Sequence, residues 1–266
     1  MFLDPSQIVL GLCSGVLVGF TLGMFGGGGS VLAVPLMVYI VGVRDPHIAI
    51  GTSAFAVAVN AGVNLISYAK SRQVIWSCAA AFSASGVLGA FGGSLVGKAI
   101  DGSRLLAYFA LLMMGVASIM FFRRNSGSPA DAQRRPRCTA EHAPKILSYG
   151  LAMGAFSGFF GIGGGFLIVP ALMAATGMPI FLAVGSSLVA VTVFGMTTAA
   201  SYVVSGLVDW SLALTFVCGG IGGGMLGRTG AKALSERKGA LNVAFSAAIF
   251  AVGVYMLMRT LMTPSV

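Results

Sequence analysis

Long apolar runs separated by short polar turns follow one another along the whole chain. Most runs approach the roughly 20 residues that an α-helix needs to cross about 30 Å of hydrocarbon. The strand alternation of an outer-membrane barrel is absent from the sequence. The pattern therefore predicts an all-α polytopic membrane protein. Its apolar segments are 7–24, 29–42, 47–69, 74–97 and 104–122 in the first half, and 146–160, 164–178, 181–205, 209–227 and 239–259 in the second.

The two halves of the chain repeat each other. The stretch GFTLGMFGGGGSVLAVP at 19–35 shares nine identical positions with GAFSGFFGIGGGFLIVP at 154–170. Between the halves, residues 123–145 are polar and rich in Pro, Ser and Arg, and they lack the apolar surface for a core of their own. We therefore expect an N-terminal transmembrane repeat at 1–122, a polar basic linker, and a C-terminal transmembrane repeat at 146–266.

The first two apolar segments of each half are short, and a glycine run separates them. The two segments either both cross the membrane or form a re-entrant hairpin that returns to its own side. Each alternative leaves an odd number of crossings per half, so the two repeats must face the membrane in opposite directions. The sequence thus predicts two inverted-topology repeats, an arrangement typical of secondary transporters.

The loop charges indicate which side faces the cytoplasm, because cytoplasmic loops carry an excess of Lys and Arg. With the N-terminus outside, twelve of these residues fall on the cytoplasmic side together with the central linker, and four fall outside. The cytoplasmic set is Lys70, Arg72, Arg123, Arg124, Arg134, Arg135, Arg137, Lys145, Arg228, Lys232, Arg237 and Lys238. The outside set is Arg44, Lys98, Arg104 and Arg259.

The composition agrees with a membrane protein and excludes several other classes. Of the 266 residues, 57% are hydrophobic and 9% are charged, whereas a soluble domain has about 25% charged residues. The net charge of +9 sits in loops without interleaved aromatic residues, which argues against nucleic-acid binding. Walker A and HExxH motifs are absent from the sequence, so we expect no enzyme activity, no cofactor and no metal site.

The glycine runs are the first candidate for a binding site. A helix that starts just after a glycine run has free N–H groups and the positive end of its dipole at the break, which favours an anion. The alternative is that glycines only allow close helix packing, and we adopt it for the later glycines of each half, such as Gly93 and Gly227. The site residues expected from the runs are Gly26, Gly27, Gly28, Gly29, Ser30, Gly161, Gly163, Gly164 and Gly165.

Neutral polar residues inside the apolar segments are the second candidate. All seven Asp and Glu residues fall in loops or at segment ends, so no carboxylate is expected mid-membrane, where cation transporters usually place one. Neutral side chains donate hydrogen bonds to an oxyanion without adding charge. The alternatives are that Ser and Thr bond back to a helix carbonyl and that Asn bridges two helices. The candidates are Thr52, Ser53, Asn60, Ser186 and Ser187.

The paired motifs GMFGGGGSVLAVP and GFFGIGGGFLIVP, with GTSAF and GSSLV after them, resemble the sulfite exporter TauE/SafE family of membrane permeases. The resemblance covers nearly the whole chain apart from the linker. It implies transport of sulfur-containing oxyanions across the bacterial cytoplasmic membrane, with Gly26–Ser30 and Gly161–Gly165 at the transport site. Gly27 stands where the second half has Ile162, so we expect the two halves of the site to be unequal.

Together these observations predict a secondary transporter that exports sulfite or an organosulfonate by alternating access. The expected partners are a small-molecule anion and the lipid bilayer of the inner membrane; nucleic acid is not expected, and a homodimer stays open. One alternative is a permease for another small solute or a metal cation. A second, disfavoured by the missing catalytic motifs, is a membrane protein without a transport function.

Overall fold

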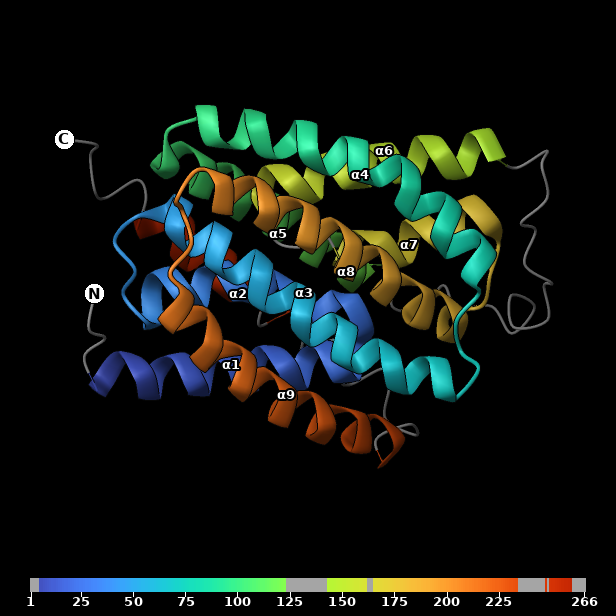
Figure 1. The fold of residues 1–266 in the computed structure, drawn as a ribbon, viewed down its shortest axis with the longest axis horizontal. Helices are drawn as coiled ribbons and strands as arrows, with labels where there is room; N and C mark the ends of the chain where they lie inside the picture. The colour runs from blue at the N-terminus through green and yellow to red at the C-terminus, as the bar shows by residue number, and fades with distance from the viewer. Residues whose placement is uncertain (1–4, 123–142, 162–164, 234–246, 248, 260–266) are drawn as a thin grey trace.

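The computed structural model describes residues 5–122, 143–161, 165–233, 247 and 249–259, and none of these lies in a strand. The described elements form an elongated bundle whose long helices run roughly along one axis (Figure 1). The first half contains α1 (Pro5–Phe25), η1 (Gly26–Leu32), α2 (Ala33–Pro35), η2 (Leu36–Ile40), α3 (Pro46–Lys70), α4 (Trp76–Ala99) and α5 (Gly102–Phe122). The second contains α6 (Ala143–Phe160), α7 (Gly165–Thr176), α8 (Ile180–Val204), α9 (Trp210–Ala233) and a final helix, Ile249–Arg259.

The all-α prediction is confirmed, and five helices in the described part of the chain are long and apolar enough to cross a membrane. These spans are Pro5–Met24, Pro46–Lys70, Trp76–Ala99, Leu182–Val204 and Trp210–Gly230. The helix α9 extends beyond the predicted apolar segment 209–227 and ends at Ala233. An apolar run marks the part of a helix that contacts lipid. The helix itself can extend further, as long as the following residues can adopt a helical conformation. Much of the linker and the start of the last predicted segment lie outside the described residues.

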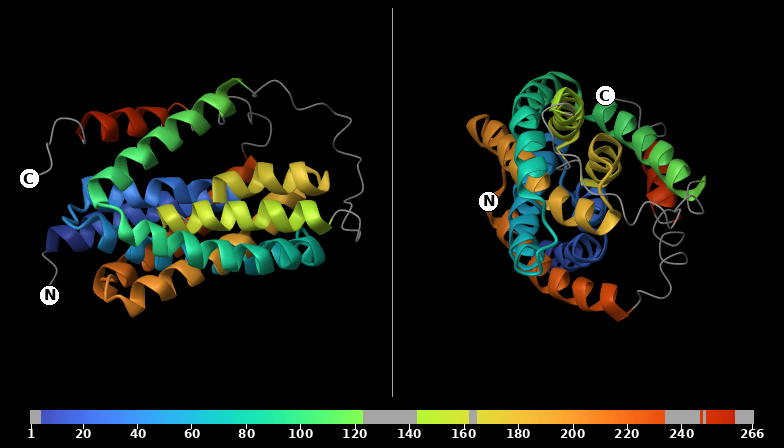
Figure 2. Two further views of the ribbon diagram at one scale, coloured as in Figure 1. Left: turned by 90° about the horizontal axis from the view of Figure 1, so that it is seen from above. Right: turned by 90° about the vertical axis from the view of Figure 1, so that its right-hand side faces the viewer.

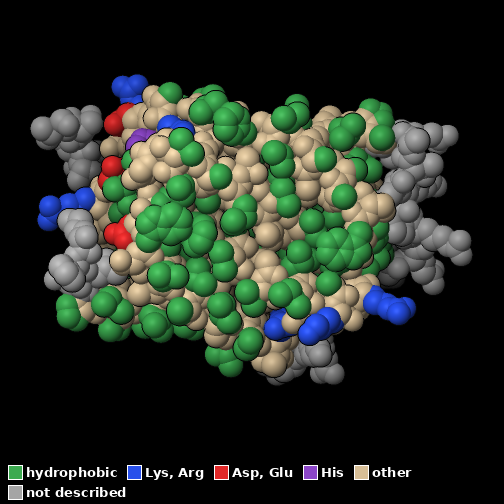
Figure 3. Space-filling view, viewed as in Figure 1, with side chains coloured by type: hydrophobic (Ala, Val, Ile, Leu, Met, Phe, Trp, Pro, Cys, Tyr) green, Lys and Arg blue, Asp and Glu red, His purple; other side chains and the backbone are tan. Residues whose placement is uncertain are grey.

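The bundle has a largely apolar outer surface and charged ends. Large exposed hydrophobic side chains such as Leu88 and Val204 face outward, as expected for contact with lipid. Figure 3 shows hydrophobic side chains along the length of the bundle, with acidic side chains gathered at one end. The described acidic residues, Asp45, Asp101 and Asp209, lie next to the first turns of α3, α5 and α9. We call this the acidic end of the bundle, and the other the basic end.

The first helix of each half ends at a glycine in a left-handed conformation. Gly26 has φ +65° and its matched residue Gly161 has φ +66°. Glycine takes up this conformation without steric cost, and it commonly terminates helices. After Gly26 the chain folds back along α1, so that the Thr21 hydroxyl donates to the Gly29 carbonyl at 3.3 Å. The glycine run therefore reverses the chain direction inside the bundle.

Each half packs mainly against the other half rather than against itself. The most extensive contacts join α1 to α9 and α4 to α6, with α3 against α8 between them. Figure 2 shows the bundle from above and end-on, with α5 and the final helix side by side on one face. Gly253 of the final helix lies against Met114 of α5. The two halves are thus interlocked and share one core.

Glycines bring the paired helices into backbone contact. On α1, the Gly15, Gly19 and Gly23 positions lie directly against backbone atoms of α9. On α6, Gly150, Gly154 and Gly158 lie in the same way against α4. The packing interpretation of the later glycines is confirmed, since Cβ atoms on Gly93 and Gly227 would overlap the backbones of α6 and α1.

These contacts also give the helix directions. Gly15, Gly19 and Gly23 meet Phe216, Gly220 and Gly224 in ascending order, so α1 and α9 are parallel. The α4–α6 pair is parallel by the same pattern, whereas α3 and α8 are antiparallel because Gly51 meets Tyr202 and Gly185 meets Tyr68. The matched helices α3 and α8 therefore run in opposite directions along the bundle. How these directions are oriented in a membrane stays a prediction.

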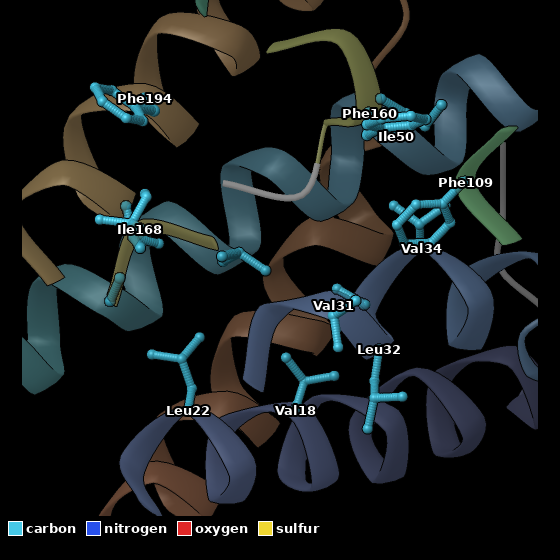
Figure 4. Close-up of a cluster of buried hydrophobic side chains, with 14 of the residues drawn as sticks. Val18, Leu22, Val31, Leu32, Val34, Ile50, Phe109, Phe160, Ile168 and Phe194 are labelled. Atoms are coloured by element: carbon cyan, nitrogen blue, oxygen red, sulfur yellow. The ribbon is translucent and has the colours of Figure 1, made fainter. Parts of the chain in front are cut away.

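Part of the hydrophobic core lies where the returning segment of the first half meets α1 and α3. Figure 4 shows Val18 and Leu22 of α1 beneath Val31 and Leu32 of η1. All four side chains are buried. The returning segment is therefore fixed by packing as well as by its glycines.

We expect Gly19→Ala to lower the free energy of unfolding by about 1–3 kcal/mol, because a Cβ there overlaps the Gly220 carbonyl of α9. Gly154→Ala, against Gly86 in the matched pair, should have an effect of the same size. Thermal unfolding in detergent measures both. The matched control is Gly92→Ala on the exposed face of α4, where a Cβ meets nothing within 4 Å. A Gly92→Ala variant as unstable as the other two would contradict the packing argument.

Candidate functional site

Each glycine break lies beside a long helix of the opposite half, α8 for Gly26 and α3 for Gly161. Gly26 approaches Val184 in the first turns of α8, and a Cβ at Gly26 would lie 2.5 Å from the Val184 Cγ1 atom. Gly161 approaches Ile50 in the first turns of α3 in the matched way. The breaks are therefore held by contacts between the halves.

Two buried hydroxyls next to these contacts bind the backbone of the opposite half. The Asp209 N–H, just before α9, donates to the Thr52 hydroxyl at 3.0 Å. The Ile75 N–H, just before α4, donates to the Ser186 hydroxyl at the same distance. Thr52 and Ser186 are fully buried, so these bonds satisfy amide groups that would be costly to leave unpaired.

The two neighbouring hydroxyls are used within their own helices. Ser53 donates to the Ile50 carbonyl at 3.0 Å, and Ser187 donates to the Val184 carbonyl at 2.8 Å. This is the back-bonding alternative considered from the sequence. Both oxygens keep acceptor capacity, but their protons are already committed in this conformation.

The expected site residues form two clusters at opposite ends of the α3–α8 pair. Gly161 lies with Thr52 and Ser53 near the acidic end, and Gly26 lies with Ser186 and Ser187 near the basic end. The cause is geometrical: α3 and α8 are antiparallel, so matched positions near their starts are far apart. The four hydroxyls thus do not meet in one shell. The η1 and α7 segments contact each other between the two clusters.

The remaining residues of the glycine runs are placed as follows. Gly29 packs against the backbone of Thr21 and Leu22, and Ser30 is fully buried. Gly27 and Gly28 belong to η1, and Gly165 is the first residue of α7. Gly163 and Gly164 lie outside the described residues.

Among the candidate site residues that the structure describes, Asn60 has side-chain hydrogen-bonding groups without a partner. It lies near the middle of α3, is fully buried, and has no hydrogen-bond partner for Nδ2 or for Oδ1. Its amide group lies against Gly220 of α9. One turn later, Asn64 donates from Nδ2 to the Asn60 carbonyl at 2.9 Å and lies against Gly224. An unpartnered buried amide costs about 1–3 kcal/mol, so Asn60 remains a candidate for binding a ligand.

The acidic residues in the described part of the chain act as helix caps. Asp45 accepts the His47 N–H at 2.8 Å at the start of α3, and Asp209 accepts the Leu212 N–H at 3.1 Å at the start of α9. These positions satisfy free N–H groups at helix starts. Among the described residues, no group of three or more His, Cys, Asp or Glu side chains is placed to hold a metal ion.

A partly buried contact around Lys98 was not predicted from the sequence. The Lys98 ammonium, in the last turn of α4, donates to the Ser201 carbonyl, the Ser201 hydroxyl and the Ser205 hydroxyl at 2.9–3.0 Å. It also lies 5.7 Å from the centre of the Tyr202 ring. The recurrence of Tyr68 as Tyr202 in the second half was the available sequence signal. These bonds tie α4 to the end of α8.

The comparisons with known proteins agree with this architecture. A probable membrane transporter protein of Xylella fastidiosa strain Temecula1 is 49% identical over 254 residues, covering 96% of each chain. The probable membrane transporter YunE of Bacillus subtilis is 27% identical, covering 83% of this chain and 85% of its own. No solved structure is significantly similar.

The family comparison covers almost the whole sequence. Residues 11–256 match the family described as sulfite exporter TauE/SafE. This range includes both glycine runs, both hydroxyl pairs and Asn60, so every expected site residue falls within it. The chain belongs to the TauE/SafE sulfite exporter family of membrane transporters.

Proposed function

We propose that this transporter exports small sulfur-containing oxyanions, such as sulfite or an organosulfonate, across the bacterial cytoplasmic membrane. The observation that carries the proposal is the chemistry of the buried polar groups. Within the described spans they are hydroxyls and amides rather than carboxylates, and Asn60 keeps a free N–H donor. Neutral donors suit an anion, whereas a cation site needs oxygen ligands with negative charge.

The two matched clusters provide a basis for alternating access. Each cluster joins the glycine break of one half to the hydroxyl pair of the other, and each lies near one end of the bundle. Separating one cluster opens the centre from one end while the other cluster keeps the opposite end closed. The Thr52 and Ser186 bonds are the contacts that such a movement breaks in turn.

The membrane potential supports the export direction. With the basic end in the cytoplasm, an anion leaving the cell moves down the inside-negative potential, which contributes about 2.3 kcal/mol per charge per 100 mV. Asn60 lies between the two clusters, where it donates a hydrogen bond to the anion in both open states. The role of the protein is binding and conformational change, without a chemical step.

We expect Asn60→Leu to reduce labelled sulfite flux in proteoliposomes at least tenfold while leaving the thermal stability unchanged or higher. Leucine has a similar volume but no donor, and it removes an unpartnered buried amide. Flux of sulfite, sulfate and an organosulfonate is measured in parallel. The control is Thr197→Val, whose hydroxyl bonds only its own helix at Val193.

Normal sulfite flux in Asn60→Leu would exclude Asn60 from the site. Failure of the wild-type protein to move any of the three anions under any gradient would refute the substrate assignment. Transport of a metal cation by the same vesicles would favour the alternative permease.

The orientation is tested by labelling single cysteines in a chain without its native cysteines. In intact spheroplasts, a membrane-impermeant maleimide should label Ser103→Cys at the exposed start of α5, at the acidic end. Ser71→Cys, exposed after α3 at the basic end, should be labelled only after lysis. The opposite labelling pattern would invert the predicted topology.

A further inference from the structure

A row of polar side chains leads from the centre of the bundle to its basic end. Asn60, Asn64 and Tyr68 follow one another at four-residue spacing on one face of α3. The facing positions of α9 are Gly220, Gly224 and Arg228, with the same spacing. Asn60 lies against Gly220 and Asn64 against Gly224, while Arg228 is close enough to interact electrostatically with Tyr68. We call these six residues the polar stripe.

The polar stripe contains hydrogen-bonding capacity that the described chain leaves unused. Neither side-chain atom of Asn60 has a partner, and the buried Arg228 Nε–H has none either. The Tyr68 hydroxyl donates to the Gly23 carbonyl at 3.3 Å, so its oxygen remains free to accept. The described acidic residues lie at the opposite end of the bundle and do not neutralise Arg228. A partly buried guanidinium that pairs with none of the described carboxylates is suited to a mobile anion.

The matched positions in the other half are different. Phe194, Thr198 and Tyr202 of α8 occupy the positions matched to the three α3 residues, and Gly86, Ala90 and Ser94 of α4 are matched to the three α9 residues. The Phe194 ring lies over Gly86 and stacks on Phe82, with ring centres 6.0 Å apart. This half therefore presents aromatic surface toward the centre of the bundle.

Lys98, which lies near Tyr202 at the acidic end of this row, is also unlike Arg228. The Lys98 ammonium directs its donors to Ser201 and Ser205, so none remains for a solute in this conformation. The Thr198 and Tyr202 hydroxyls are also buried without a partner, so both rows hold unpartnered polar groups. Among these matched positions, the amide side chains and the guanidinium occur only in the polar stripe.

We infer that the polar stripe is the route by which an anion reaches the centre from the basic end, with Arg228 as its first binding group. The identity of the anion rests on the proposed function, but the route does not. In the described conformation the stripe is closed by α9, whose glycines present only backbone to Asn60 and Asn64. Separation of α3 from α9 exposes Arg228, Tyr68, Asn64 and Asn60 in that order. A planar guanidinium binds two oxygens of an oxyanion at once, which lysine does not reproduce.

The test is sulfite flux in proteoliposomes of known orientation, with the concentration varied on one side at a time. We expect Arg228→Gln to raise the KM from the basic end at least tenfold and to leave the KM from the acidic end within twofold. Arg228→Lys should be intermediate, because it keeps the charge but loses the bidentate geometry. The control is Lys70→Gln, which removes the same charge from an exposed position at the same end. It should stay within twofold of wild type.

A second measurement separates this inference from the substrate assignment. The melting temperature of the detergent-solubilised full chain is recorded with chloride, nitrate, sulfate, sulfite or phosphate. One outcome refutes the substrate and supports the route: the wild-type protein transports no sulfur oxyanion, but one of these anions raises its melting temperature. In that case Arg228→Gln should lose the stabilisation and Lys70→Gln should keep it. An unchanged KM together with unchanged anion stabilisation in Arg228→Gln would overturn the route, as would a wild-type protein that neither moves nor responds to any anion.

Discussion

Backbone contact between the two halves is the constraint on which the rest of the structure depends. In a bilayer, helices gain no hydrophobic free energy by leaving lipid for one another, so close packing and polar contacts must hold them together. Gly19 against Gly220 and Gly154 against Gly86 provide that packing at two matched crossings. Because each crossing joins different halves, neither half completes its core alone. The interlocked arrangement follows from where the glycines lie.

The same interlocking determines what the glycine runs do. Gly26 and Gly161 reverse the chain next to α8 and α3, so the returning segments enter space that the opposite half has already shaped. The start of α3 is then close to the loop before α9, where Thr52 accepts a backbone N–H group. The start of α8 is likewise close to the loop before α4, where Ser186 accepts one. The packing of each glycine break against the opposite half therefore accounts for the chain reversal, the burial of the hydroxyls and the position of the two clusters.

Much of this architecture was predictable, because it depends on local pattern. The apolar segments agree with the described helices to within a few residues at most ends, and the packing role of Gly93 and Gly227 followed from their four-residue spacing. The separation of Thr52 from Ser186 was not predictable in the same way. Sequence matching identifies equivalent residues but not their distance, which depends on the antiparallel packing of α3 against α8. The bonding of Lys98 likewise required the position of the α8 end.

The symmetry of the frame makes its departures informative. In each half, a side chain of the long central helix packs over a glycine of its neighbour. In the second half this side chain is the aromatic ring of Phe194, which lies over Gly86. In the first half the side chain is Asn60, which lies over Gly220 with its amide donor and acceptor both unpaired. The unpaired amide lowers the stability of the fold, whereas an aromatic ring does not. Since Phe194 shows that the frame accepts an apolar side chain there, stability does not explain Asn60. The cost is intelligible if the amide gains its partner only when a solute reaches the centre of the bundle.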